Sequence, residues 1–195
     1  MDRIIEMELE RKGGILRTSD LVGLGYSKPA IAELVRDHEL DRVAHGVYVR
    51  SGEFADDMSV LQIRSPRVVF SHESALWLNG LSDREPFEMS VTVARGAPLA
   101  ASLRGLCRCH YVKRELLDLG LSSARTACGC VVRCYSPERT ICDIVRDSDQ
   151  MGIEEVSGGL KRYAAAKKKN FVELMRIASA FGIEKEIAGY MGVLS

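Results

Sequence analysis

Residues 18–48 read TSDLVGLGYSKPAIAELVRDHELDRVAHGVY, and this stretch decides the fold of the first part of the chain. A short capped helix is expected at its start, and a turn that contains two glycines follows. Ser27 is a suitable N-cap for a second helix. Residues 40–43 and 47–49 then read as two strands, because Gly46 between them provides the backbone freedom that a tight turn needs. Helix, turn, helix and hairpin in this order predict a winged helix-turn-helix.

The flanking regions set the limits of this domain. Residues 2–12 place isoleucines and a leucine at helical spacing, so a further helix is expected in front of the motif. Residues 51–57 are polar and contain glycine, which is typical of a linker. We therefore predict a winged helix-turn-helix domain over residues 1–52 and a second domain over residues 58–195.

The second domain mixes strand and helix patterns. Apolar and alternating runs predict strands at 67–70, 89–93, 107–112 and 131–135. Capped amphipathic runs predict helices at 59–64, from 72, from 137, at 154–166, at 171–181 and from 184 to 190. The expected fold class is α+β, with an N-terminal winged helix-turn-helix domain followed by a mixed α/β C-terminal domain that ends in helices.

Composition and charge limit the kinds of protein that this chain can be. The chain has 195 residues and a formal net charge of +0, so any affinity for nucleic acid has to come from local basic patches. No apolar run approaches the roughly twenty residues that span a bilayer. The N-terminus is charged throughout and lacks the apolar region of a secretory signal. We therefore expect a cytoplasmic protein that has no membrane partner.

The second helix and the hairpin supply the candidate contacts to double-stranded DNA. Lys28, Ala32 and Arg36 recur every four residues, so they share the outward face of the helix. The predicted DNA-binding residues are Ser27, Lys28, Ala32, Arg36, Arg42, His45 and Arg50. Interleaved acidic residues would repel phosphates unless they turn away. A winged helix that serves only protein contacts is the alternative.

Six cysteines are present, namely Cys107, Cys109, Cys128, Cys130, Cys134 and Cys142. Without a signal peptide they are expected to be free thiols. The pairs 107/109 and 128/130 allow another interpretation, because alternate residues of a strand share a face and two adjacent strands would join four thiolates into a tetrahedral zinc set. However, CxC within strands is not the usual zinc spacing, and cysteine is often buried in cores. No metal and no cofactor are therefore expected.

The chain carries no recognisable catalytic motif. No strand has the acid-x-lysine pattern of a Mg²⁺-dependent nuclease, and no G-x-x-x-x-G-K-[ST] phosphate-binding loop occurs. The histidines, at positions 38, 45, 72 and 110, are scattered along the sequence. We therefore expect no enzymatic activity, and Mg²⁺-dependent cleavage of DNA by the pure protein would contradict this expectation.

Three segments carry a resemblance to a known family. They read GGILRTSDLVGLGYSKPAIAELVRDHELDRVAHGVYVR, FSHESALWLNGLSDREPFEMSVTV and VVRCYSPERTICDIVRD. Together they resemble the AbiEi family of antitoxins from bacterial abortive-infection (type IV) toxin–antitoxin systems. The resemblance implies a protein that binds operator inverted repeats and represses its own operon. It also implies that the protein opposes a nucleotidyltransferase-like toxin, usually without a stable complex. The CxC pairs are a departure from the family.

The resemblance further implies a basic face on the C-terminal domain. The candidates for such a second basic patch are Lys161, Arg162, Lys167, Lys168 and Lys169. Lys161 and Lys168 share a face only if the helix continues that far, and an ordinary solvated surface is the alternative. For the whole protein, the alternative function is a winged-helix transcription regulator whose C-terminal domain senses a ligand or mediates dimerisation, without a toxin partner.

Overall fold

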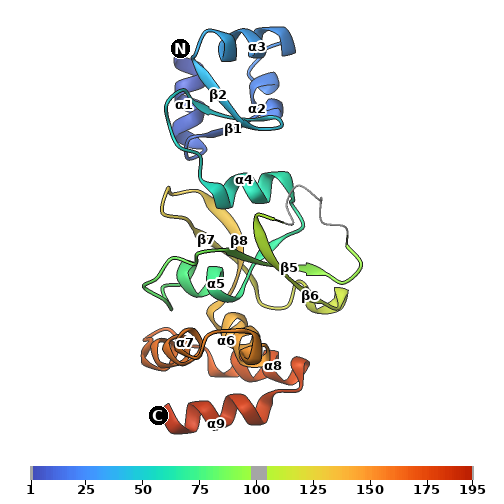
Figure 1. Cartoon of the computed structure of the whole chain (residues 1–195), viewed down its shortest axis with the longest axis vertical. Helices are drawn as coiled ribbons and strands as arrows, with labels where there is room; N and C mark the ends of the chain where they lie inside the picture. The colour runs from blue at the N-terminus through green and yellow to red at the C-terminus, as the bar shows by residue number, and fades with distance from the viewer. Residues whose placement is uncertain (1, 98–104, 195) are drawn as a thin grey trace. The chain divides into compact units, whose positions relative to one another are not determined.

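The chain forms two compact units. The computed structural model describes residues 2–97 and 105–194. Unit 1 comprises Met1–Pro66 and Arg125–Val131, and unit 2 comprises Arg67–Ala124 and Val132–Ser195. The predicted α+β class is confirmed, because a helix-rich region with a small sheet comes first and a mixed sheet followed by helices comes second (Figure 1). The limits 1–52 and 58–195 for functional domains stay a prediction.

Unit 1 contains the winged helix-turn-helix. Its elements are α1 (Arg3–Arg11), β1 (Ile15–Arg17), α2 (Thr18–Gly23), α3 (Lys28–Arg36), β2 (Leu40–Ala44), β3 (Val47–Arg50) and α4 (Asp57–Arg64). Strand β3 pairs antiparallel with both β1 and β2. Leu16 and Tyr48 join the buried cluster of α1, α2 and α3, whereas Val47 and Val49 join another cluster that includes residues of α4. The alternation along these strands therefore anchors helices on both faces of the sheet.

The two helices of the motif begin in different ways. Thr18 is the first residue of α2, and its N-cap is Arg17, whose backbone N–H donates to Oδ2 of Asp20 at 2.7 Å. The Asp20 carboxylate thus supports the start of the short helix that the sequence predicted here. Ser27 caps α3 as predicted, because its Oγ accepts the N–H of Ala30 at 3.3 Å.

Unit 2 is built on a mixed sheet. Its strands are β4 (Val69–Phe70), β5 (Met89–Ala94), β6 (Cys107–Val112), β7 (Leu121–Arg125) and β8 (Val131–Tyr135). In the described part of the chain the order is β6-β5-β4-β8-β7. Strand β5 runs antiparallel to β4 and parallel to β6, and β4 runs parallel to β8. Strand β7 was not predicted, because its sequence LSSAR is largely exposed and therefore shows no apolar alternation.

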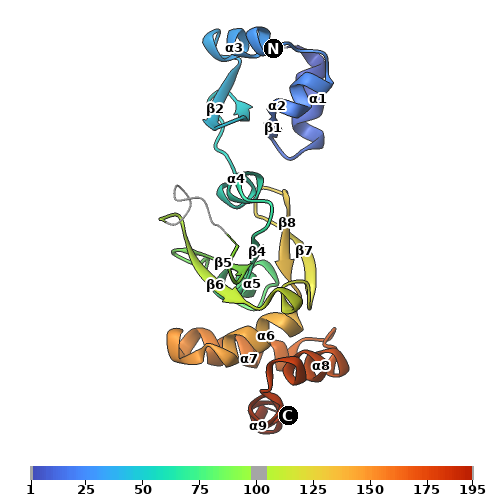
Figure 2. The ribbon, with the colours of Figure 1, turned by 90° about the vertical axis from the view of Figure 1, so that its right-hand side faces the viewer.

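Helices complete unit 2. They are α5 (His72–Leu78), α6 (Pro137–Arg146), α7 (Ile153–Ala165), α8 (Phe171–Phe181) and α9 (Glu184–Leu194), with short 3-10 turns at Arg114–Leu116 and Ser148–Gln150. Helix α6 contacts α7 and α8, and both views place these three helices together (Figures 1 and 2). Their apolar faces form one cluster with α5 and α9. Within the described ranges, no helix has the length and apolar character to cross a membrane.

Candidate nucleic-acid interface

A groove of about 680 Å³ lies on the winged-helix part of unit 1. Three elements supply its polar lining, namely the start of α2, the helix α3 and the hairpin of β2 and β3, which is the wing. The lining side chains that can donate hydrogen bonds or carry positive charge are Arg17, Thr18, Ser19, Lys28, Arg42 and His45. Ile31, Val35 and Tyr48 add apolar atoms. The groove therefore offers donors beside apolar surface, which suits a polyanion with exposed bases.

The sequence shapes this groove at Gly46. The N–H of Thr18 donates to the carbonyl of Gly46 at 2.9 Å, so the turn of the wing is joined to the start of α2. Gly46 has a φ of +70°, and a Cβ at this position would lie 3.1 Å from Oγ1 of Thr18. A glycine is required here for both reasons, because larger residues rarely adopt this backbone and would crowd the threonine.

The structure brings four of the seven predicted DNA-binding residues together. Lys28 and Ala32 of α3 and Arg42 and His45 of the wing line the groove. The Nη2 atom of Arg42 lies 2.9 Å from Nδ1 of His45, which joins the two wing side chains. Lys28 is exposed and forms no ion pair with the described residues. Its charge is thus available to a ligand.

The other three predicted residues lie outside the groove lining. Ser27 is used as the cap of α3. Arg36 is 71% exposed and faces Glu33 at 3.7 Å and Asp37 at 3.6 Å. Arg50, at the end of β3, faces the carboxylate of Glu53 at 3.3 Å. The acids that interleave with the basic residues in the sequence therefore neutralise part of the charge of both arginines.

Sequence reasoning missed the contribution of the start of α2. The sequence predicts only a short capped helix at this point, yet the side chains of Arg17, Thr18 and Ser19 line the groove. The available signal was their order: a basic residue and two hydroxyls stand at the start of the helix that precedes the turn into α3. Their approach to the wing depends on the pairing of β1 with β3, which joins Arg17 to Val47.

The second predicted basic patch does not form one helical face. Helix α7 ends at Ala165, so Lys167, Lys168 and Lys169 lie in the connection to α8, and the premise of a continuing helix is wrong. Arg162 pairs with Asp83, and Lys169 donates to the carbonyl of Ala164. Ala166 has an extended backbone and is the C-cap of α7, and the ammonium of Lys169 stabilises the end of the helix by donating to one of its last carbonyls.

The cysteines do not form the considered zinc set. Cys107 and Cys109 lie on β6, with their Sγ atoms 3.8 Å apart, whereas Cys130 directly precedes β8. Strands β5 and β4 separate β6 from β8 in the described sheet, so the two pairs are not on adjacent strands. All six cysteines are free thiols. The four-thiolate hypothesis is wrong because it assumed a pairing that the sheet order does not contain.

Unit 2 brings together two histidines that the sequence left scattered. His72, at the start of α5, and His110, on β6, stack with ring centroids 3.5 Å apart, and Asp147 follows α6 beside them. Burial and the charge of His72 lower the pKa of His110 to about 4. Burial opposes ionisation of Asp147, but hydrogen bonds from Arg146 and His72 outweigh it and hold the pKa of this carboxyl well below its usual range. The cluster thus presents a neutral imidazole beside a carboxylate.

The family match found by comparison with known proteins lies in unit 1. Residues 3–51 match the family model AbiEi_4, described as a transcriptional regulator and AbiEi antitoxin. The crystal structure of RV2827C protein from Mycobacterium tuberculosis is similar over 96% of this chain and 76% of that chain, with a TM-score of 0.64 and 18% sequence identity. At this identity the likeness shows the fold. No curated protein matches the sequence.

Proposed function

We propose, from the AbiEi regulator domain that residues 3–51 match, that the chain is a DNA-binding antitoxin that represses its own operon. The observation that carries the proposal is the groove in unit 1, because Arg17, Lys28 and Arg42 place three basic side chains around it. The groove lies within the matched residues. A regulator of this kind would act where its operator is, in the cytoplasm, and its function would be non-enzymatic.

Each wall of the groove has a role in the proposed complex. Helix α3 enters the major groove of DNA, where Lys28 donates to base or phosphate acceptors and Ala32 allows close approach. Arg17 and Ser19 contact phosphates at the edge of the same groove. Arg42 and His45 on the wing reach the backbone or the adjacent minor groove.

The charges on the chain indicate how many copies bind one operator. The chain is neutral overall, and Arg36 and Arg50 face acidic neighbours. Since phosphate contacts supply much of the affinity for DNA, one winged helix with three groove cations is expected to bind weakly. Two copies on an inverted repeat would double the number of contacts. We therefore expect the functional complex to contain two chains on one operator.

The partner toxin is the other half of the proposal. In the proposed function, residues 58–195 act as the antitoxin domain and oppose a nucleotidyltransferase-like toxin without forming a stable complex with it. The alternative is a regulator whose unit 2 senses a ligand, and a pocket of about 450 Å³ in unit 2 favours it. Co-expression with the product of the neighbouring gene separates the two: rescue of growth supports the antitoxin, and the absence of toxicity supports the regulator.

Fluorescence anisotropy with DNA from upstream of the gene tests the DNA-binding proposal. The wild type should prefer a fragment that contains the inverted repeat over a scrambled fragment of the same length. The Lys28→Ala/Arg42→Ala variant should lose at least about tenfold in affinity, since each contact contributes about 1–3 kcal/mol. The matched control, Arg114→Ala/Lys185→Ala, removes two exposed charges from unit 2. Equal binding by all three proteins would refute the assigned interface.

A further inference from the structure

We propose that His72, His110 and Asp147 form a binding site for a first-row transition-metal dication such as Zn²⁺. Among the described residues, these three bring their ligand atoms within 4.8 Å of one another. Two imidazoles and one carboxylate are a donor set that suits Zn²⁺, Co²⁺ and similar ions better than Mg²⁺ or Ca²⁺. The site lies in unit 2 and is independent of the DNA-binding proposal.

The fold assembles this set from three distant parts of the sequence. His72 begins α5, two residues after the end of β4, and His110 lies on β6; β5 separates these strands. Asp147 is the C-cap of α6. Its Oδ2 atom lies 2.9 Å from Nε2 of His72 and 3.8 Å from Nδ1 of His110, so one carboxylate oxygen is close to both rings. The three ligand atoms are therefore close enough together for one ion to be shared among them.

Neighbouring groups orient the ligands. Oγ of Ser71 lies 3.0 Å from Nδ1 of His72, and Oγ1 of Thr92 donates to the same Ser71 oxygen at 2.9 Å. This hydrogen bond leaves Nε2 of His72 directed at Asp147, as a second-shell partner does in metal sites. His72 also holds a φ of +47°, a region that non-glycine residues rarely adopt. Such strain is retained where the surroundings impose it, and it clusters at ligand sites.

One nitrogen of the cluster lacks a hydrogen bond. Nε2 of His110 is buried and has no hydrogen-bond partner among the residues that the structure describes. A buried polar atom left unpaired calls for an explanation, and a bound ion is one of the recognised ones. Nδ1 is the ring nitrogen of His110 that lies near Asp147, so Nε2 becomes a ligand only if the ring, which stacks on His72, turns about its Cβ–Cγ bond.

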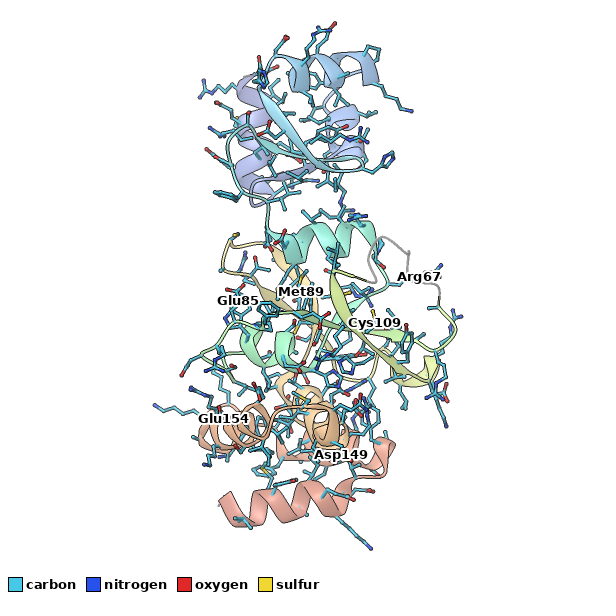
Figure 3. All side chains as sticks on the ribbon, in the orientation of Figure 1. Arg67, Glu85, Met89, Cys109, Asp149 and Glu154 are labelled. Atoms are coloured by element: carbon cyan, nitrogen blue, oxygen red, sulfur yellow. The ribbon has the colours of Figure 1, made fainter. Side chains whose placement is uncertain are left out.

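The site opens onto the pocket of unit 2. His110 and Asp147 line this pocket, together with Arg95, Lys113 and Arg146. Figure 3 labels Cys109, the sequence neighbour of His110 on β6, and Asp149, in the 3-10 turn that follows Asp147. Three protein ligands leave one coordination position for an outside group. The surrounding cations favour an anionic group there.

Arg146 lowers the expected affinity of the site for a metal ion. Its Nε donates to Oδ1 of Asp147 at 2.9 Å and its Nη2 donates to Oδ2 at 2.7 Å. A metal at Oδ2 has to displace Nη2, whereas Nε can remain on Oδ1. Binding through Nε2 of His72 also requires that this atom carry no proton, so metal uptake would release a proton wherever it carries one. The nearby positive charge lowers affinity, which favours ions that bind nitrogen strongly over Mg²⁺.

Titration of the EDTA-treated full chain with Zn²⁺ and Co²⁺ tests the proposal, with calorimetry for stoichiometry and absorption for the Co²⁺ ligands. We expect about one equivalent bound and a Co²⁺ spectrum without thiolate charge transfer. His110→Gln and Asp147→Asn should each weaken binding at least about tenfold, and Ser71→Ala, which keeps all three ligands, should weaken it about 10–100-fold. Mg²⁺ should not compete.

Two controls make the result specific. Asp149→Asn removes an exposed carboxylate two residues from Asp147, and Cys107→Ser/Cys109→Ser removes the nearest thiol pair. Both should bind like the wild type. Absence of binding by the wild type, loss of binding in the cysteine variant, or unchanged binding in His110→Gln would overturn the assignment. If a ligand variant fails to fold by circular dichroism, Ser71→Ala and the cysteine variant still decide the question.

Discussion

At the scale of single residues, Arg139 organises the interior of unit 2. Its side chain is fully buried, and its Nε donates to Oδ1 of Asp143 at 3.0 Å. Its guanidinium lies 4.0 Å from the ring centroid of Tyr135, and one nitrogen donates to the carbonyl of Leu116 at 2.8 Å. A charge in this position is stable only because each partner is in place.

Replacing Arg139 with Met should destabilise the protein by about 3–5 kcal/mol, because Asp143 would keep a buried charge without its main partner. The double variant Arg139→Met/Asp143→Leu should lose less than the sum of the two single variants, since it removes both charges. Urea denaturation of the wild type, the two single variants and the double variant measures this cycle. Strict additivity would mean that the pair is not coupled.

A substitution at Gly120 tests how tightly the side chain of Arg139 is packed. It has a φ of +71°, and an added Cβ would lie 2.5 Å from Cβ of Arg139. Gly120→Ala should therefore cost about 2–4 kcal/mol from backbone strain and overlap together. Gly80→Ala is the matched control, because Gly80 has a φ of +69° but nothing lies within 4 Å of an added Cβ. We expect the control to cost about 1–2 kcal/mol, and equal losses in denaturation would exclude overlap as a cause.

At the scale of elements, the groove of unit 1 distinguishes residues that share one helix face in the sequence. Lys28 and Arg36 both lie on α3, but only Lys28 lines the groove, and Arg36 faces two acids. The outward face of α3 is therefore longer than the part of it that borders the groove. The wing and the start of α2 select the section of α3 that a ligand can reach.

This difference gives a prediction for operator binding. Lys28→Ala should cost about 1–3 kcal/mol if a base edge is contacted. Arg36→Ala should cost less, because its guanidinium is already shared between Glu33 and Asp37. Anisotropy titrations at one salt concentration compare the two variants directly. A larger loss for Arg36→Ala would place the DNA farther along α3 than the groove indicates.

The connection between α7 and α8 is the other element with a predicted DNA role. Neutralising Lys167, Lys168 and Lys169 should flatten the salt dependence of operator binding by about 0.9 for each lysine that touches a phosphate. The three residues are exposed. Affinity measured over a range of salt concentrations gives the slope, and an unchanged slope would identify them as solvated surface charges.

At the scale of the whole molecule, unit 1 is not one continuous segment. It takes Arg125–Val131 from the middle of the chain. The hydroxyl of Thr126 donates to the carboxylate of Asp56, which caps α4, and Cys130 joins the buried cluster of Val47 and Val49. The winged helix thus depends on a segment about seventy residues away in sequence.

Thr126→Val should therefore loosen unit 1. It removes one hydrogen bond to a buried carboxylate, at a cost of about 1–3 kcal/mol. Hydrogen exchange should show faster opening in α4 and in strands β1, β2 and β3. Thr126→Ser keeps the hydroxyl and should retain most of the protection. If Thr126→Val leaves exchange in these strands unchanged, the middle segment contributes nothing to the stability of unit 1.

The sequence by itself determined the local elements of this protein, namely the Ser27 cap of α3, the glycine turn of the wing and the order that makes a winged helix-turn-helix. These features depend on residues that are close together in the sequence, so they can be predicted from the order of the residues. Only the tertiary structure decided which residues meet. It placed Arg17 and Lys28 on the lining of one groove, kept the cysteine pairs off adjacent strands, and brought His72, His110 and Asp147 together. Those contacts depend on strand order and packing between distant segments, which no local pattern encodes.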